Sequence, residues 1–282
     1  MSLGELLDKQ FPPENHLVAP GLLDFNSLMI LGGPPKAYKS FTLATMAIDL
    51  ACGRPLFGVF RKGNHGKQEP VFLVRKQCKV LIVEQEVGYM DMQTRMATMI
   101  CDLSPADREL CRKNIEIESC NFDIKLDKDN GRIILHDLIK KHLPDVLIID
   151  PLREMHGRNE NDATDMAAVF GHLDWLRQRY NFATIISHHT RKEHREEHAE
   201  GADLLRGSSY VFGKADSLVI CKPASRKQPG LINLDFTLRR GKPIADLQLV
   251  INPSNMRMCF NKWLIGSGAR EDKQKFDELI IQ

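Results

Sequence analysis

Short runs of consecutive apolar residues recur along this chain and predict strands that are buried on both faces. Four of these runs are bounded by charged or turn-forming residues, at positions 28–31, 80–83, 146–149 and 183–187. Continuous apolar runs of this length are typical of parallel strands that helices cover from both sides. We therefore expect the four runs to form the centre of one parallel sheet.

A second spacing of apolar residues, with a period near that of the α-helix, predicts helices between the strands. In the clearest case, residues 162–180, apolar side chains recur at spacings of three and four: Met166, Val169, Phe170, Leu173 and Leu176. Asp162 is placed to cap the N-terminus of this helix. Strands that alternate with helices predict an α/β fold with a mainly parallel central sheet flanked by helices.

The pattern changes after Ser217, where strand-like runs at 218–221, 231–238 and 247–251 are separated by short turns. This spacing predicts an antiparallel C-terminal extension of the sheet. We expect one domain over residues 21–265, with an N-terminal segment at 1–20 and a linker with a short helix at 266–282. Two polar stretches are expected at the surface: a loop or hairpin at 61–79 and a mobile loop at 190–201.

Composition narrows the class of protein. The 282 residues are 43% hydrophobic, which is enough for a substantial core and excludes disorder throughout. The net charge of +2, from 39 basic and 37 acidic residues, gives no global field that would attract nucleic acid. The seven cysteines are scattered and include no Cys-x-x-Cys pair, which favours a protein of the reducing cytoplasm over one with a disulfide framework or a zinc site. Because no apolar run approaches ~20 residues, we expect no membrane association.

The strongest candidate for chemistry is the segment Gly-Pro-Pro-Lys-Ala-Tyr-Lys-Ser at residues 33–40. It lies between a predicted strand and a predicted helix, as does the phosphate-binding loop Gly-x-x-x-x-Gly-Lys-Ser/Thr. Lys39 holds the position that reaches the β- and γ-phosphates, and Ser40 the position whose hydroxyl holds Mg²⁺. Tyr38 stands where the second glycine belongs. The alternative is a strand-to-helix turn with no ligand.

The whole loop and the residue after it are the predicted nucleotide-binding residues: Gly33, Pro34, Pro35, Lys36, Ala37, Tyr38, Lys39, Ser40 and Phe41.

Three carboxylates follow predicted strands. Glu84 and Glu86 share a face while the chain stays extended, so either could look toward a nucleotide. In a nucleotide hydrolase of this plan, a carboxylate at the end of the strand next to the loop's strand polarises the attacking water. We favour Glu86 for this role, with Glu84 second; two solvated charges are the alternative. Asp150 ends an apolar strand, as in a Walker B motif, and is the candidate Mg²⁺ residue.

Two further groups could contact a γ-phosphate. Either His188 or His189 could sense it at the end of a strand, and we favour His189 because Thr190 and a charged loop follow. Arg239 and Arg240 end a strand, and one of them could reach the phosphate bound by a neighbouring subunit. Structural histidines and ordinary surface arginines are the alternatives.

Together these residues resemble the RecA-like ATPases of the hexameric replicative helicase type, especially the branch of the plasmid RepA helicase and many phage and mobile-element ATPases. The resemblance extends over residues 21–251. Its most specific pieces are the loop at 33–40, the run at 51–58, Val-Glu-Gln-Glu86 with Arg95 nine residues on, Ile-Ile-Asp150-Pro-Leu, Ser187-His-His-Thr-Arg-Lys, and Arg-Gly-Ser-Ser209 followed by Asp216.

The resemblance implies ATP hydrolysis with Mg²⁺, Lys39 and Ser40 at the phosphates, Glu86 as catalytic base, Asp150 at the metal and His189 as γ-phosphate sensor. It also implies a homo-oligomer, most simply a hexameric ring, that contacts single-stranded DNA. Two positions depart from the pattern. Tyr38 replaces a glycine, and Asp216 stands where the plasmid helicase has its arginine finger, so Arg239 is the substitute.

Three functions compete at this point. The first is an ATP-dependent DNA helicase or a replication or recombination motor. The second is a nucleotide-gated binding protein with slow or no hydrolysis, which Tyr38 and the missing finger favour. The third is a small-molecule phosphotransferase, which is less favoured because the sequence shows no evident lid for a phosphate acceptor.

Overall fold

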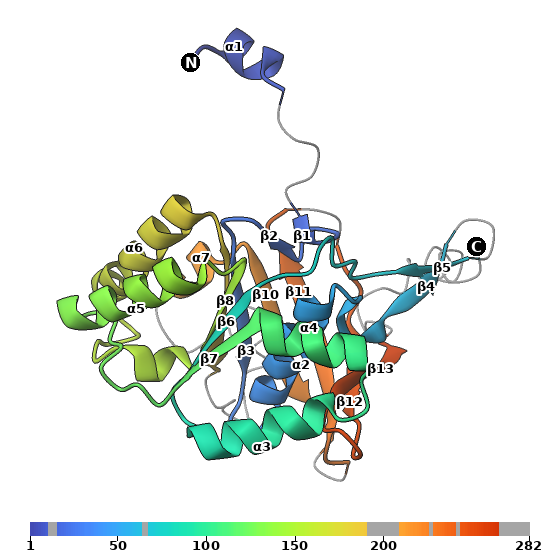
Figure 1. Ribbon diagram of the computed structural model, residues 1–282. Helices are drawn as coiled ribbons and strands as arrows, with labels where there is room; N and C mark the ends of the chain where they lie inside the picture. The colour runs from blue at the N-terminus through green and yellow to red at the C-terminus, as the bar shows by residue number, and fades with distance from the viewer. Residues whose placement is uncertain (11–15, 64–66, 191–208, 226–227, 241–242, 265–282) are drawn as a thin grey trace, which may run out of the picture.

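In the computed structural model, the described parts of the chain contain one nine-stranded sheet with helices on both faces (Figure 1). The structure describes residues 1–10, 16–63, 67–190, 209–225, 228–240 and 243–264. The sheet consists of β3 (Leu28–Gly33), β6 (Val80–Glu84), β7 (Ile115–Ser119), β8 (Val146–Asp150), β9 (Ala183–His189), β10 (Ser217–Pro223), β11 (Leu231–Leu238), β12 (Leu247–Ile251) and β13 (Met258–Trp263). Their order across the sheet is β13-β12-β11-β10-β3-β9-β8-β6-β7.

The four predicted central strands are confirmed as β3, β6, β8 and β9, and all lie in the parallel part of the sheet. The predicted helix is α6 (Ala163–Tyr180), and the Asp162 side chain accepts the N–H of Asp165 at its N-terminus. The α/β class, the mainly parallel sheet and the antiparallel C-terminal strands are therefore as predicted.

Two details of the sheet differ from the prediction. The run at 218–221, expected to begin the antiparallel part, is β10, which pairs in parallel with β3; the antiparallel part begins with β11. The strand that ends in Glu84 does not lie beside the strand of the loop, because β9 and β8 separate β6 from β3. Local sequence does not encode which strands become neighbours.

Helices cover the two faces of the sheet in separate layers. Strand side chains alternate between the faces, so Met29 and Leu31 pack toward α2 (Lys39–Cys52), whereas Leu28 and Ile30 pack toward the other side. On α2 lie α3 (Tyr89–Ile100) and α4 (Pro105–Asn114). The opposite face is covered by α5 (Asp129–His142), α6 and α7 (Ser209–Lys214) (Figure 1).

The smaller elements complete the described chain. They are α1 (Leu3–Asp8), β1 (His16–Val18), β2 (Leu23–Asp24), η1 (Leu56–Gly58), β4 (Phe60–Lys62), β5 (Gln68–Pro70) and η3 (Leu152–Met155). β4 and β5 form an antiparallel hairpin that overlaps the start of the predicted surface segment 61–79. The later part of that segment is not all at the surface, because Phe72, Val74 and Cys78 are buried. Leu17 and Val18 of β1 are fully buried in the core on the α2 side.

Some predictions fall outside the described residues. The loop at 190–201 is described only at Thr190, and the Arg-Gly-Ser-Ser209 run only through the backbone of Ser209. The tail at 266–282 is also outside. None of the helices among the described residues is long and apolar enough to cross a membrane.

Candidate active site

The predicted phosphate loop connects the end of β3 to the start of α2. β3 ends at Gly33 and α2 begins at Lys39, so Lys39 and Ser40 form the first turn of the helix. Gly33 lies against β10: a Cβ atom there would be 2.7 Å from the carbonyl oxygen of Cys221. Only glycine allows the loop to start this close to the neighbouring strand.

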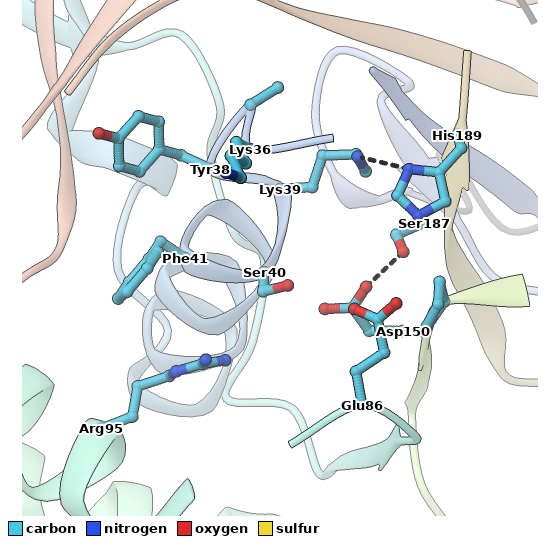
Figure 2. A pocket seen from close by; sticks show the side chains of 12 residues that line it. Lys36, Tyr38, Lys39, Ser40, Phe41, Glu86, Arg95, Asp150, Ser187 and His189 are labelled. Atoms are coloured by element: carbon cyan, nitrogen blue, oxygen red, sulfur yellow. Dashed lines mark hydrogen bonds between the residues drawn. The ribbon is translucent and has the colours of Figure 1, made fainter. Parts of the chain in front are cut away.

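Tyr38 adopts the backbone conformation that a glycine favours at this position. It precedes the first residue of α2 with φ 56° and ψ 23°, in the left-handed region. This conformation costs a non-glycine residue about 1–2 kcal/mol. The Tyr38 ring lies 6.3 Å from the ring of Phe41, centroid to centroid, and points away from Lys39 (Figure 2). The departure from the motif thus changes the side chain and adds strain while the loop keeps its left-handed turn.

The Lys39 ammonium is buried within the loop. Its Nζ donates to the carbonyl oxygens of Gly33 at 2.9 Å and Pro34 at 3.0 Å, and lies 3.4 Å from Nδ1 of His189. Burial lowers the pKa of Lys39, while the nearby Cys221 and Asp150 act in the opposite direction. The Lys39 ammonium is desolvated, and its present acceptors are carbonyl oxygens, which carry only a partial negative charge. Phosphate oxygens carry a full negative charge, so they would be stronger partners for this cation.

Strand register places the acidic and histidine candidates at the same edge of the sheet as the loop. Gly33 pairs with His189 between β3 and β9, and Glu84 pairs with Asp150 between β6 and β8. A cavity of about 310 Å³ opens at this edge. It is lined by Lys36, Ala37, Tyr38, Lys39, Ser40, Phe41, Glu86, Arg95, Asp150, Pro151, Ser187 and His189 (Figure 2).

The two candidate glutamates occupy different environments. β6 ends at Glu84, which is 2% exposed, whereas Glu86 is exposed and lines the cavity. Glu84 also lines a small space together with Ser40, Arg95 and Asp150, so the two glutamates lie on the same side of the sheet and differ in their exposure. Burial, and next the Asp150 carboxylate, raises the pKa of Glu84 to about 7. Burial and then Asp150 also raise the pKa of Glu86.

The two candidate histidines also separate. His189 lines the cavity beside Lys39 (Figure 2). His188 is 1% exposed, and its Nε2 lies 3.8 Å from Oε2 of Glu160, outside this cavity. Burial lowers the pKa of His188 to about 4, so its imidazole is neutral at physiological pH.

The oxygen groups of the cavity suit a hard divalent cation. Asp150 is buried and accepts a hydrogen bond from the Ser187 hydroxyl (Figure 2). The Ser40 hydroxyl lines the same cavity. Among the described residues there is no group of three His, Cys, Asp or Glu side chains that could hold a metal ion by themselves. Mg²⁺ usually takes one or two protein oxygens and completes its shell with water and phosphate, so Ser40 and Asp150 are the residues that could hold it.

Arg239 is not brought to this cavity. It follows Leu238, which pairs with Ser217 at the start of β10, so Arg239 lies at the sheet edge opposite the phosphate loop. Its guanidinium donates to the carbonyl oxygen of Gly213. Asp216 has a structural role, because its carboxylate accepts the backbone N–H of Leu28 at 3.0 Å.

Three residues of the cavity, Arg95, Pro151 and Ser187, were not among the predicted site residues. Arg95 of α3 lies over the Phe41 ring, 5.0 Å from its centroid. Ser187 contacts Asp150 from β9. The spacing of Arg95 from Glu86 was visible in the sequence, but no residue pattern indicated that α3 turns this side chain toward the loop.

The fold and the loop at the end of β3 define the class as a RecA-like P-loop protein. The model of the AAA_25 family, described as AAA domain, matches residues 2–195. The chain belongs to this family, because the match extends over more than half of its length. No curated protein matches the sequence.

Solved structures share the fold at low sequence identity. One, described as an ATPase domain, is 12% identical with a TM-score of 0.56, over 84% of this chain and 85% of that one. A DnaB-like replicative helicase, described with its interactions with primase, is 12% identical with a TM-score of 0.58, over 83% of this chain and 57% of that one. The RadB recombinase is 13% identical with a TM-score of 0.53, over 83% of this chain and 90% of that one.

Proposed function

We propose that this protein binds ATP with Mg²⁺, hydrolyses it, and acts as a DNA helicase or as a replication or recombination motor. The observation that carries the proposal is the convergence of Lys39, Ser40, Glu86, Asp150 and His189 on one cavity. These residues come from four separate parts of the chain. A simple strand-to-helix turn would not require them to meet.

The loop and Lys39 are proposed to bind the phosphates. Backbone N–H groups at the start of α2 and the helix dipole favour a negative charge at this position. Lys39 then exchanges its carbonyl partners for oxygens of the β- and γ-phosphates. Ser40 and Asp150 are the residues that would hold Mg²⁺, which supplies neutralisation of charge on the phosphates.

Glu86 is proposed to accept a proton from the attacking water. Its carboxylate lines the cavity on the same side as Asp150 (Figure 2). The raised pKa of Glu86 makes it a stronger base than an ordinary glutamate once ionised. His189, 3.4 Å from the Lys39 ammonium, is proposed to contact the γ-phosphate and to transmit its presence along the chain to Thr190.

Ring assembly and DNA belong to the proposal as well. Arg239 can serve a phosphate only on a neighbouring subunit, because it lies at the far edge of its own sheet. We further propose a homo-oligomeric ring, most simply a hexamer, with single-stranded DNA as the partner and the cytoplasm as the compartment. The structural similarity to a replicative helicase and a recombinase supports the same class of function.

The test is the rate of phosphate release from ATP and Mg²⁺, with and without single-stranded DNA. We expect DNA to stimulate turnover. Lys39→Ala removes a charged contact worth about 1.5–3 kcal/mol, so ATP affinity falls roughly ten- to a hundredfold. The control is Lys113→Ala, an exposed lysine on α4 that leaves turnover unchanged. Equal turnover of both variants at ATP concentrations below the wild-type KM would refute the assignment of the loop.

A second function is favoured by the left-handed Tyr38. The motif has a glycine at this position, so the tyrosine side chain stands where the motif has only a hydrogen atom and could slow hydrolysis. In this second function, bound ATP controls the binding of partners and is hydrolysed slowly or not at all. Tight ATP binding without turnover, with or without DNA, would support this function. Rapid turnover that Lys39→Ala abolishes would exclude it.

A further inference from the structure

The carboxylate of Glu84 makes contacts that the roles above do not use. Glu84 is the last residue of β6 and is 2% exposed. Its Oε1 accepts two backbone hydrogen bonds, from the N–H of Glu86 at 2.8 Å and from the N–H of Val87 at 3.2 Å. One side-chain oxygen therefore closes a tight turn directly after the strand.

Other hydrogen bonds hold the residues on either side of Glu86. The N–H of Gln85 donates to the carbonyl oxygen of Asp150 at 2.9 Å, and its Nε2 donates to that of Asn121 at 2.9 Å. The Ser119 hydroxyl donates to the carbonyl oxygen of Val87. The turn is thus attached to β8 on one side and to the end of β7 on the other, with the Glu84 carboxylate at its centre.

The two glutamates lie on the same side of the sheet but at different depths. Glu84 is buried in a small space that Ser40 and Asp150 also line, whereas Glu86 is exposed at the cavity beside Asp150 and Lys39. The amide that Glu84 holds is that of Glu86 itself, so loss of this bond frees the backbone that carries the candidate base.

We propose that Glu84 is a positioning residue, whose carboxylate oxygen fixes the backbone of residues 86 and 87 so that Glu86 is directed at the attacking water. The inference rests on the proposed function for its effect on turnover. The acceptor oxygen, and not the negative charge, carries the role, since a side-chain amide oxygen accepts the same two bonds.

Two variants separate the acceptor from the charge. Glu84→Gln keeps an oxygen at the same position, so we expect turnover within about threefold of wild type. Glu84→Leu removes the acceptor, and misplacement of Glu86 lowers kcat by about ten- to a hundredfold with the ATP dissociation constant unchanged. On a Glu86→Gln background, Glu84→Leu has no further effect on kcat, because its action passes through Glu86.

Amide hydrogen exchange tests the same contacts without hydrolysis. We expect Glu84→Leu to lose protection at the amides of residues 86 and 87, and Glu84→Gln to keep it. If wild type does not hydrolyse ATP, the proposed function fails, while the exchange still tests the role of Glu84 in the turn.

Two results would overturn the inference. A kcat for Glu84→Gln as low as for Glu84→Leu would show that the charge acts directly, for example at the metal. Unchanged exchange in Glu84→Leu would show that the turn does not depend on the carboxylate. If Glu84→Leu does not fold, Glu84→Gln decides, because it must keep both turnover and protection.

Discussion

The backbone conformation of Tyr38 predicts that glycine is more stabilising than alanine at this position, the reverse of the usual order in helices. At most helical positions, replacing alanine by glycine costs about 1 kcal/mol. Tyr38 has φ 56° and ψ 23°, a conformation that costs an L-residue about 1–2 kcal/mol and costs glycine nothing. The extra chain entropy of glycine offsets about 0.5–1 kcal/mol of this gain. We therefore expect Tyr38→Gly to be more stable than Tyr38→Ala by about 0–1.5 kcal/mol, with a central value of about 0.75 kcal/mol.

Comparing these two variants removes the effect of the tyrosine ring, since both lose its contact with Phe41. The assay is urea unfolding of both proteins without nucleotide, with the midpoint and slope fitted separately. The matched control is Ala97→Gly, at an exposed position inside α3, which we expect to lower stability by about 1 kcal/mol. An advantage for alanine of about 1 kcal/mol, as at the control position, would refute the left-handed loop.

Two further predictions concern stability at buried positions. Asp49 is 4% exposed and accepts the N–H of Phe57 at 2.8 Å, and burial raises its pKa to about 7. The fold therefore retains a proton that the unfolded chain releases above about pH 4, so stability falls as pH rises from there to about 7. At pH 8 the free energy of unfolding of Asp49→Asn, measured with urea, should exceed that of wild type by up to a few kcal/mol, and this difference should disappear near pH 4. A difference that does not depend on pH would contradict the prediction. Gly33→Ala places a Cβ 2.7 Å from the Cys221 carbonyl oxygen and should lower the free energy of unfolding by about 1–3 kcal/mol. The control is Gly171→Ala in α6, where a Cβ would have no atom within 4 Å, so this change should stabilise the fold. Equal effects of the two changes in thermal unfolding would contradict the close approach of β3 and β10.

Local sequence was sufficient for the parts of the fold whose pattern is strong. The four central strands are apolar throughout because both of their faces are covered. The helix at 163–180 carries its own capping residue, Asp162. β7 was missed because it lies at the edge of the sheet, where Glu116 is exposed between Ile115 and Ile117 and the next glutamate, Glu118, is half-buried.

The candidate site also divides into residues that local sequence could identify and features that depend on contacts formed only in the fold. Lys39, Ser40, Glu86, Asp150 and His189 could be selected because parallel strands end at a common edge, where polar residues following a strand meet. The parallel pairing of β10 depends on contacts between residues almost two hundred positions apart, and spacing along the chain contains no record of them. The turn after Glu84 depends on a side chain that accepts the backbone N–H groups two and three residues further along, a contact that no pattern of apolar and polar residues indicates.

The most direct test of the account compares ATP binding with hydrolysis in Glu86→Gln. Equilibrium titration with ATP and Mg²⁺ gives the affinity, and a single-turnover reaction gives the rate of cleavage. The account predicts wild-type affinity and a cleavage rate lower by about 10²–10⁴, the usual contribution of a general base, with Glu109→Gln, an exposed glutamate on α4, unchanged in both. Cleavage by Glu86→Gln at the wild-type rate would contradict the central claim that this cavity hydrolyses ATP through Glu86.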